Sequence, residues 1–285
     1  MNNCIEIKGL CKTYKDFALD HVDLIVPGGS ILGLIGENGA GKSTIIKCIL
    51  NLIRRDGGTI TLLGRDNLAQ ELEVKQDIGV VLDDCYFHDS LRAGDVDRIL
   101  RRVYHNWDRE LFQSYCKRFS LPADKTIKNY SRGMKTKLCL AAALAHRPKL
   151  LILDEATSGL DPVVRDEILE EFMGFIRDEE HGILISSHIT SDLEKAADYI
   201  TYLHRGKVAL SGAKDELLER YGRLVCGRAD LERVDMTWVV GIRTSQFGCE
   251  ALIKDRAAFQ RAYPHLTVDP VSLEEIMVFM VRGEQ

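Results

Sequence analysis

The feature that most restricts this sequence is a glycine-rich loop at residues 36–43, which reads GENGAGKS and fits the pattern G-x-x-x-x-G-K-[ST]. An apolar run at 31–35 precedes it, and an amphipathic run at 45–50 follows it. A strand, this loop and a helix in that order form a phosphate-binding loop, because the glycines turn successive N–H groups inward and the helix dipole adds positive potential. The alternative is a glycine-rich turn with a chance lysine, which the flanking strand and helix disfavour.

The loop predicts a nucleotide and magnesium as ligands. Lys42 is expected to hold the β- and γ-phosphates, and the Ser43 hydroxyl is expected to ligate Mg²⁺. The nucleotide contacts expected from this segment are Gly36, Glu37, Asn38, Gly39, Ala40, Gly41, Lys42, Ser43 and Thr44. By itself, the loop is shared by NTPases and kinases.

Short apolar runs alternate with amphipathic stretches through the first two thirds of the chain, which is typical of a sheet flanked by helices. The expected strands are 31–35, 78–82, 150–153, 183–186, 199–203 and 207–210. Between the second and the third of these, apolar residues recur at helical spacing around 96–103 and 111–119. The sequence therefore predicts an α/β fold of the P-loop NTPase type with an inserted helical lobe at about residues 84–145.

Two neighbouring carboxylates, Asp154 and Glu155, follow the apolar strand at 150–153. Strand ends of this kind open onto the ligand crevice of an α/β sheet. Asp154 is expected to belong to the magnesium shell, and Glu155 to polarise the water that attacks the γ-phosphate. One carboxylate here could simply cap the next helix, but two are less expected in that role after a phosphate loop.

With three further motifs, the chain resembles the ATP-binding subunit of an ABC transporter over roughly residues 4–220. Residues 130–134, YSRGM, lie about 20 residues before Asp154, where that family keeps its signature. Residues 158–161, SGLD, resemble the family's D-loop, and His188 stands in the place of its switch histidine. Five motifs in the family's order are far more specific than any one of them.

The resemblance implies a composite site between two ATP-binding domains that face head to tail. Ser131 and the amide of Gly133 would contact the γ-phosphate bound by the other subunit, and Asp161 would belong to the same interface. Ser131 also stands where a helix running to Ala145 is expected to begin, so hydroxyl, free N–H groups and dipole would meet an anion. Without the other motifs, Ser131 would be read as an ordinary helix N-cap.

Two further residues gain a role only from the resemblance. His188 would sense the γ-phosphate and help to hold the attacking water, although alone it would be read as a histidine at a strand end. Tyr14 resembles the aromatic residue on which the family stacks adenine. A tyrosine in a polar loop can equally be ordinary surface.

The sequence departs from the family in two places. Asp83 replaces the usual glutamine after the strand at 78–82; its carboxylate is a candidate magnesium ligand but is one methylene shorter. In the signature, Arg132 replaces the first glycine and Met134 the usual glutamine. Signatures of this type resemble those of transporters with a separate, export-type permease, and the replaced glutamine puts turnover and coupling in doubt.

Composition limits the other functions open to the chain. The longest unbroken apolar run has eight residues, 138–145, whereas a membrane-spanning helix needs about 20, and no signal peptide pattern is present. A net charge of -5 gives no footprint for nucleic acid. The eight cysteines are scattered without a C-x-x-C pair, so we expect buried free thiols. We expect a cytoplasmic protein on the inner membrane face, with no nucleic acid partner.

The sequence therefore predicts an ATP-binding domain at 1–220 and a small α+β accessory domain at 221–285, to which no chemistry is assigned. The leading hypothesis is an ATPase subunit that dimerises, as a homo- or heterodimer, around two Mg-ATP and drives a separate membrane permease, an exporter. The alternative is an ABC ATPase that acts on ribosomes or nucleic acid, although such proteins usually carry two cassettes or a long coiled coil. A small-molecule kinase would leave the signature, the D-loop and the switch histidine unexplained.

Overall fold

The computed structural model describes residues 2–158, 160–244 and 248–282 of the chain. Its central sheet has six strands in the order β10-β9-β3-β8-β7-β6, all parallel except β10, which is antiparallel to β9. The strands are β3 (Ser30–Gly36), β6 (Ile78–Val81), β7 (Leu150–Asp154), β8 (Gly182–Ser186), β9 (Tyr199–His204) and β10 (Lys207–Ala213). The predicted α/β class is confirmed, and the first four predicted strands each match within one residue at either end.

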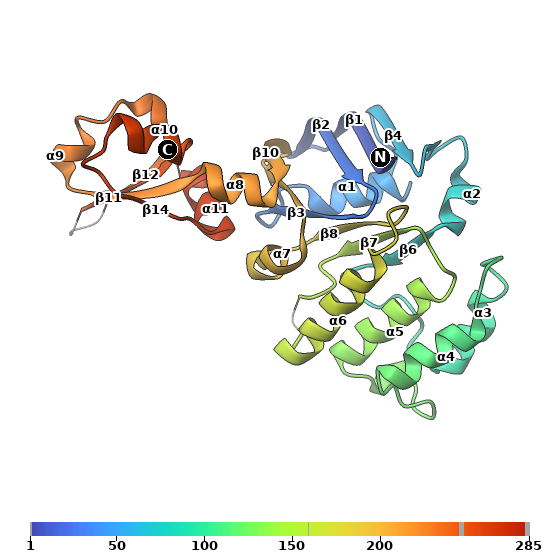
Figure 1. The fold of residues 1–285 in the computed structure, drawn as a ribbon. Coiled ribbons are helices and arrows are strands. Elements are labelled where there is room, and N and C mark those ends of the chain that lie inside the picture. Colours follow the sequence, from blue (N-terminus) through green and yellow to red (C-terminus); the bar gives the residue numbers. More distant parts are fainter. Residues whose placement is uncertain (1, 159, 245–247, 283–285) are drawn as a thin grey trace.

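Every residue of β3, β7 and β8 is buried, so these strands need apolar side chains on both faces. Leu32 and Leu34 point into one core and Ile31 and Ile35 into the other. Figure 1 shows α1 (Lys42–Ile49) and a second sheet on one side of the central sheet, with the larger helices on the other. This double burial explains why continuous apolar runs predicted the strands.

The second sheet, which the sequence analysis did not predict, is antiparallel in the order β2-β1-β4-β5. Its strands are β1 (Asn3–Thr13), β2 (Ala18–Pro27), β4 (Gly57–Leu62) and β5 (Arg65–Asp66). Its pairing contains several register shifts, and these bulges break the alternation of apolar and polar residues by which such a strand is recognised. The short loop between β1 and β2 carries Tyr14 and Phe17.

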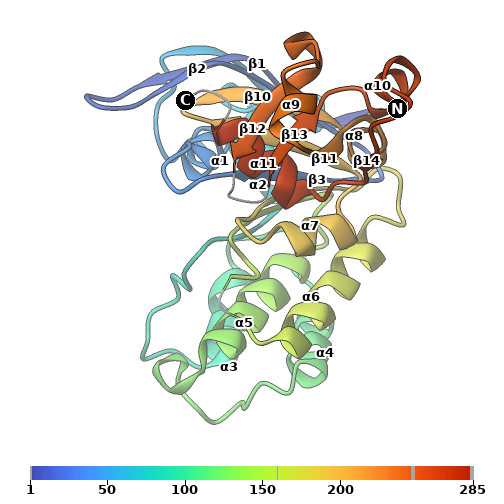
Figure 2. The same ribbon diagram turned by 90° about the vertical axis from the view of Figure 1, so that its left-hand side faces the viewer.

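Residues 82–149, all of which the structure describes, contain helices and no strand. The helices are α3 (Ala93–Leu100), α4 (Arg109–Arg118), the 3-10 turn η1 (Ile127–Asn129) and α5 (Arg132–Leu144), and they lie below the sheets in Figure 2. The apolar repeat at 96–103 is helical only as far as Leu100, and Ile99 and Val103 are about half exposed. The repeat therefore predicted the helix but not how much of its apolar face stays open.

Three helices complete the parallel core: α2 (Glu71–Gln76), α6 (Pro162–Phe175) and α7 (Thr190–Ala196). No helix in the described part of the chain is long and apolar enough to cross a membrane.

All eight cysteines are free thiols, but only Cys4, Cys48 and Cys249 are buried. The expectation of burial was wrong for the other five, which are partly exposed because they lie in loops or on helix and strand faces at the edges of the cores.

The C-terminal region adds a third, antiparallel sheet in the order β12-β13-β11-β14. Its elements are α8 (Lys214–Arg220), β11 (Gly222–Cys226), α9 (Arg228–Leu231), η2 (Met236–Trp238), β12 (Val239–Thr244), β13 (Cys249–Ile253), α10 (Arg256–Ala262), β14 (Val268–Asp269) and α11 (Leu273–Arg282). These strands and α10 enclose a small core around Phe259.

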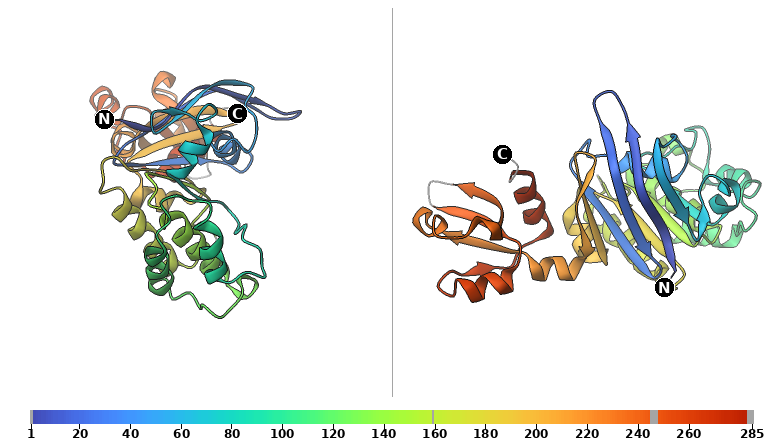
Figure 3. Two further views of the ribbon diagram at one scale, coloured as in Figure 1. Left: turned by 90° about the vertical axis from the view of Figure 1, so that its right-hand side faces the viewer. Right: turned by 90° about the horizontal axis from the view of Figure 1, so that it is seen from above.

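The C-terminal sheet stands beside the main body in Figure 3, with α8 leading into it. The last helix, α11, returns to the main body: Ile276 and Phe279 are buried in the main core, and the Leu273 N–H donates to Glu194 Oε1 of α7 at 2.7 Å. The C-terminal region is thus a small α+β unit that has its own core and is attached through one of its helices.

Candidate functional site

The backbone of the loop at 36–43 is built to meet an anion. Gly39 and Gly41 have φ angles of 83° and 113°, which glycine adopts without strain. A Cβ on Gly41 would lie 2.7 Å from Phe17 Cζ, and the φ of 113° would strain any other residue at this position. No side chain caps the start of α1 and its first turn holds no acid, which leaves the N–H groups and the positive end of the helix dipole open to a ligand.

Lys42 places a fixed positive charge at this loop. Its side chain is almost fully buried, its Nζ donates to the Gly36 carbonyl oxygen at 2.8 Å, and the same Nζ lies 3.7 Å from Glu155 Oε1. A buried ammonium group needs anionic or polar partners, because desolvation otherwise costs several kcal/mol. The same Nζ also donates to the Glu37 carbonyl oxygen at 3.4 Å, so its present partners are oxygens that phosphate oxygens can replace.

A cavity of about 710 Å³ opens at the loop, a volume within the range of ligand pockets. Its walls come from the β1–β2 loop, the phosphate loop, the end of β6, the start of α5 and the ends of β7 and β8. The residues that line it are Tyr14, Asp16, Phe17, Glu37, Asn38, Gly39, Gly41, Lys42, Ser43, Thr44, Asp83, Arg132, Glu155, Ser158 and His188. Most residues expected at a nucleotide site thus meet in one cavity.

Two predicted loop residues and one predicted metal ligand are outside this lining. Gly36 and Ala40 do not line the cavity and lie against each other, since a Cβ on Gly36 would be 3.1 Å from Ala40 Cβ. Asp154 is buried at the end of β7, and its Oδ1 accepts a hydrogen bond from Ser186 Oγ at 2.5 Å. One oxygen of Asp154 is therefore already engaged inside the protein.

Glu155 and His188 lie in contact in the lining of the cavity. His188 Nδ1 lies 2.6 Å from Glu155 Oε2, which leaves Oε1 toward Lys42. The backbone of Glu155 has a φ of 52°, a left-handed conformation that is unusual for glutamate. Hydrogen bonds from its N–H to Ser186 hold it there, so the strain serves to aim this carboxylate into the cavity.

The aromatic wall of the cavity is larger than predicted. Tyr14 is 45% exposed, with its ring centroid 6.4 Å from that of Phe17 and with Lys12 Nζ 5.4 Å from its own ring centre. Phe17 was missed by the sequence analysis. The signal available was a second aromatic residue three positions after Tyr14 in the same short loop. Two rings at one edge form a platform for a flat aromatic ligand.

Three predicted contacts from the signature and the D-loop lie outside this lining. Ser131 is exposed and caps α5, its Oγ accepting from the Met134 N–H at 3.3 Å, and Gly133 lies in the first turn of the same helix. Asp161 caps α6 by accepting from the Val164 N–H at 3.1 Å. None of Ser131, Gly133 and Asp161 lines the cavity of its own chain. Residue 159, within the predicted D-loop, lies outside the described residues.

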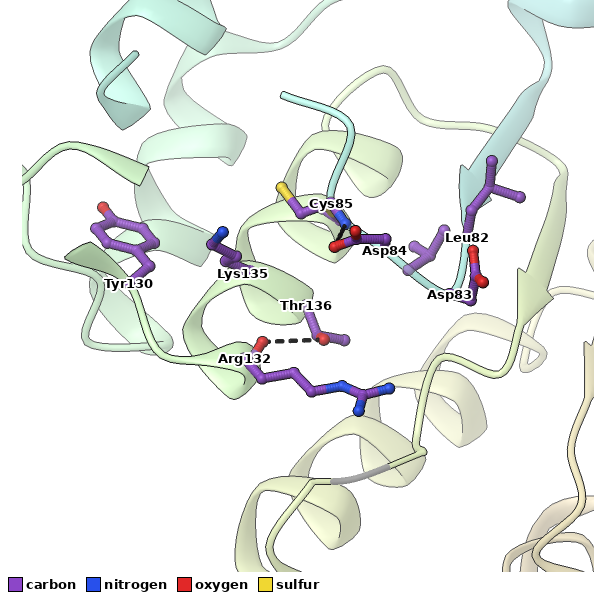
Figure 4. A pocket seen from close by; sticks show the side chains of 10 residues that line it. Leu82, Asp83, Asp84, Cys85, Tyr130, Arg132, Lys135 and Thr136 are labelled. Carbon is purple, nitrogen blue, oxygen red and sulfur yellow. Dashed lines mark hydrogen bonds between the residues drawn. The ribbon is translucent and has the colours of Figure 1, made fainter. Parts of the chain in front are cut away.

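The two departures from the family's pattern meet at this cavity. Asp83 and Arg132 line it from opposite elements, and both also line a second cavity next to it. In Figure 4 the Arg132 side chain extends from the start of α5 toward the segment that carries Asp83. Tyr86 donates a hydrogen bond to Asp83 at 3.4 Å, and the charge of that carboxylate raises the pKa of the Tyr86 phenol.

The oxygen ligands near the loop fit a magnesium ion. Ser43 and Asp83 line the cavity, and Asp154 lies behind it. Within the described ranges, no three His, Cys, Asp or Glu side chains are grouped closely enough to hold a metal by themselves. Mg²⁺ is commonly bound by one or two carboxylates together with waters and substrate phosphates, so this sparse set suits that ion when a nucleotide is present.

A parallel sheet whose β3 leads through an uncapped glycine loop into α1, with a buried lysine at the turn, is the fold of a P-loop nucleotide-binding protein. A family model for ABC transporters matches residues 19–158. The lantibiotic transport ATP-binding protein SrtF of Streptococcus pyogenes is 35% identical over 213 residues, covering 74% of this chain and 91% of that protein. The bacitracin transport ATP-binding protein BcrA of Bacillus licheniformis is 29% identical over 269 residues, covering 93% and 87%.

Among solved structures, the ATP-binding subunit of an ABC transporter superposes with a TM-score of 0.69 at 27% identity, covering 75% of this chain and 91% of that chain. The chain belongs to the ABC transporter family and is an ATP-binding, ATP-hydrolysing subunit of such a transporter. Because these relatives are named for transport, they favour this function over an ATPase of ribosomes or nucleic acid.

Proposed function

We propose that this subunit binds ATP with its triphosphate on the loop at 36–43 and its adenine against Tyr14 and Phe17, and that Glu155 is the general base of hydrolysis. The contact that carries the proposal is the Glu155–His188 pair at 2.6 Å, with Lys42 at 3.7 Å from the same carboxylate. A water between this carboxylate and the terminal phosphate loses a proton to Glu155, while His188 orients the carboxylate. The ammonium group of Lys42 stabilises charge on the phosphate oxygens.

Magnesium, when bound, neutralises phosphate charge and helps to align the leaving group. We propose that the Ser43 hydroxyl and the Asp83 carboxylate hold it from the cavity wall. Asp154 would help to hold it through its second carboxylate oxygen, because Ser186 Oγ already donates to Oδ1.

The signature residues act, in our proposal, on the ATP of a second ATP-binding subunit. Ser131 is exposed at the start of α5 and does not line its own cavity. Two subunits placed head to tail bring this helix start to the partner's phosphates, where hydroxyl and dipole favour an anion. Asp161, at the start of α6, lies at the same interface.

We further propose that the subunit works on the cytoplasmic face of a membrane with a separately encoded permease, and that the direction of transport is export. The names of SrtF and BcrA, which refer to transport of lantibiotics and of bacitracin, support a transport role. The signature at 130–134 supports the export type by its resemblance. We assign residues 1–220 to the ATP-binding domain, with its helical lobe at 84–145, and 221–285 to an accessory domain.

The decisive test is Glu155→Gln, which keeps the shape of the side chain and removes its basicity. We expect ATP binding to persist and hydrolysis to fall about 10²- to 10⁴-fold. We also expect a dimer of the subunit to accumulate in the presence of ATP. Nucleotide affinity, phosphate release and light scattering measure the three effects. Glu110→Gln, an exposed residue of α4, is the matched control and should behave like the wild type. Hydrolysis by Glu155→Gln at the wild-type rate would remove Glu155 from its role as base.

A further inference from the structure

A second cavity, of about 490 Å³, lies next to the nucleotide cavity between the segment that follows β6 and the first turns of α5. Figure 4 shows the side chains that surround it. Its lining is Val81, Leu82, Asp83, Asp84, Cys85, Tyr130, Arg132, Lys135, Thr136 and Cys139. None of the roles assigned above uses its two cysteines.

The two cysteines line the same cavity, although they are far apart in sequence. Interaction with the Cys85 thiol raises the pKa of Cys139. Both are partly exposed and pack against the rim of the main core, whereas Cys4 and Cys48 are buried. Because both residues line the cavity, a small molecule that enters it reaches them.

The pair joins two elements that act on nucleotide. Cys85 lies two residues after Asp83, which lines the nucleotide cavity. Cys139 lies about two helical turns after Ser131, on the helix whose first turn carries the signature. A covalent bond between the two sulfurs would therefore hold the start of the helical lobe at a fixed distance from α5.

We propose that Cys85 and Cys139 are a redox-sensitive thiol pair that a hydroperoxide converts into a disulfide, locking the segment after β6 to α5. The Cys85 sulfur attacks the terminal oxygen of the peroxide, the O–O bond breaks, and an alcohol or water leaves with the thiol proton. The Cys139 sulfur then attacks the sulfenic sulfur, an S–S bond forms, and water leaves. Two thiols are oxidised and one peroxide is reduced, and a cellular dithiol reverses the change by exchange.

The disulfide slows ATP turnover without blocking ATP binding. This consequence rests on the proposed function. In that proposal α5 contacts the ATP of a partner subunit, while the segment after β6 contacts the ATP of its own chain. The phosphate loop and α1 lie outside the locked segment, so ATP affinity is retained. Disulfides inside cells are usually transient and act as sensors, which fits a partly exposed pair in the lining of a cavity.

A second cysteine pair in the chain offers a matched control. Cys226 and Cys249 lie opposite each other on the paired strands β11 and β13. Cys249 is buried, and the pair lies in the C-terminal unit, away from both cavities. If proximity alone decided oxidation and inactivation, this pair would respond as strongly as Cys85 and Cys139.

The test treats the reduced full-length chain with hydrogen peroxide, blocks remaining thiols by alkylation and maps linked peptides by mass spectrometry without reduction. We expect a Cys85–Cys139 link that disappears in Cys139→Ser and persists in Cys226→Ser. The oxidised wild type should lose most of its ATPase activity, regain it with dithiothreitol, and bind ATP as the reduced protein does. Cys139→Ser should keep its activity in peroxide.

Peptide mapping does not depend on catalysis, so a chain without ATPase activity would refute the proposed function and leave the thiol assignment to be decided by the map. Absence of the Cys85–Cys139 link after peroxide would overturn the pair. A link that leaves turnover unchanged would overturn its control of the enzyme. Protection of activity by Cys226→Ser in place of Cys139→Ser would do the same.

Discussion

The phosphate-loop region and the signature region differ in how complete a site each forms within one chain. At the phosphate loop, Lys42, Glu155 and His188 come from three separate elements and meet within hydrogen-bond or ion-pair distance. At the signature and the D-loop, Ser131 and Asp161 are each occupied in capping their own helices. The first region is a formed site, and the second is a pair of helix starts from which only Arg132 lines the cavity.

This difference follows from how each region is supported. The phosphate loop is held between β3 and α1, and Glu155 is fixed by Ser186 of the neighbouring buried strand. The start of α5 is capped by its own Ser131 side chain. A helix start that is capped by a short hydroxyl side chain still offers N–H groups and dipole to a ligand, so it suits contact with a separate subunit.

The largest effect on this comparison should come from Lys42→Ala, which removes the charge from the formed site. We expect ATP affinity to fall about 10- to 150-fold, because a hydrogen bond to a charged group contributes about 1.5–3 kcal/mol. Calorimetric titration of the purified chain measures this. Lys47→Ala, an exposed residue of the same helix, should bind ATP like the wild type. Equal binding by Lys42→Ala would mean that the loop is not the phosphate site.

Ser131→Ala should have a smaller effect, which we expect on stability and turnover and not on ATP affinity. Loss of the cap should reduce the free energy of unfolding by about 1 kcal/mol. ATP affinity of the isolated chain should stay the same, and turnover should fall, since the hydroxyl acts on a partner's ATP. Urea unfolding, titration and phosphate release separate these quantities.

The control for Ser131 is Asp255→Ala, which removes the equivalent cap from α10. It should lose similar stability and keep its turnover. Weaker ATP binding by isolated Ser131→Ala would break the distinction between the formed region and the partner-facing region.

The smallest effect is expected on stability, at the contact between the helical lobe and the sheet. His146, just after α5, is buried, donates from Nε2 to the Ile78 carbonyl oxygen at 3.1 Å and stacks on Tyr104 at 3.9 Å. Burial lowers the pKa of His146 below its usual 6.5, because the interior favours the neutral ring. As pH falls below 6.5, the unfolded chain takes up the proton first, so stability present above that pH is lost.

We expect this histidine to contribute at most about 1.4 kcal/mol per pH unit to the slope of unfolding free energy below its unfolded pKa. Urea unfolding between about pH 7.5 and 5.5 measures it. His146→Phe keeps the ring and removes the titration, so its slope should be flatter. The exposed His105→Gln should keep the wild-type slope. A slope in His146→Phe equal to that of the wild type would show that His146 does not contribute to the pH dependence of the unfolding free energy.

Much of the fold and the site could be predicted from local patterns. Strands buried on both faces are continuous apolar runs, as in β7 and β8, and a phosphate loop is contiguous in sequence. The N-terminal sheet was missed because bulges interrupt its alternation. Phe17 was missed because one aromatic residue in a loop carries no sign of which cavity it faces.

The sequence by itself determined the chemistry: the order of the phosphate loop, signature, acidic pair, D-loop and histidine identifies an ABC ATPase, because each motif is a short run with a local conformation. Only the tertiary structure decided which distant residues meet. It brought Asp83 and Arg132 to the same two cavities, placed Cys85 and Cys139 in the lining of one cavity, and left Ser131 outside the nucleotide cavity of its own chain. The physical reason is that such contacts depend on how helices and strands pack, and residue spacing along the chain does not encode that packing directly.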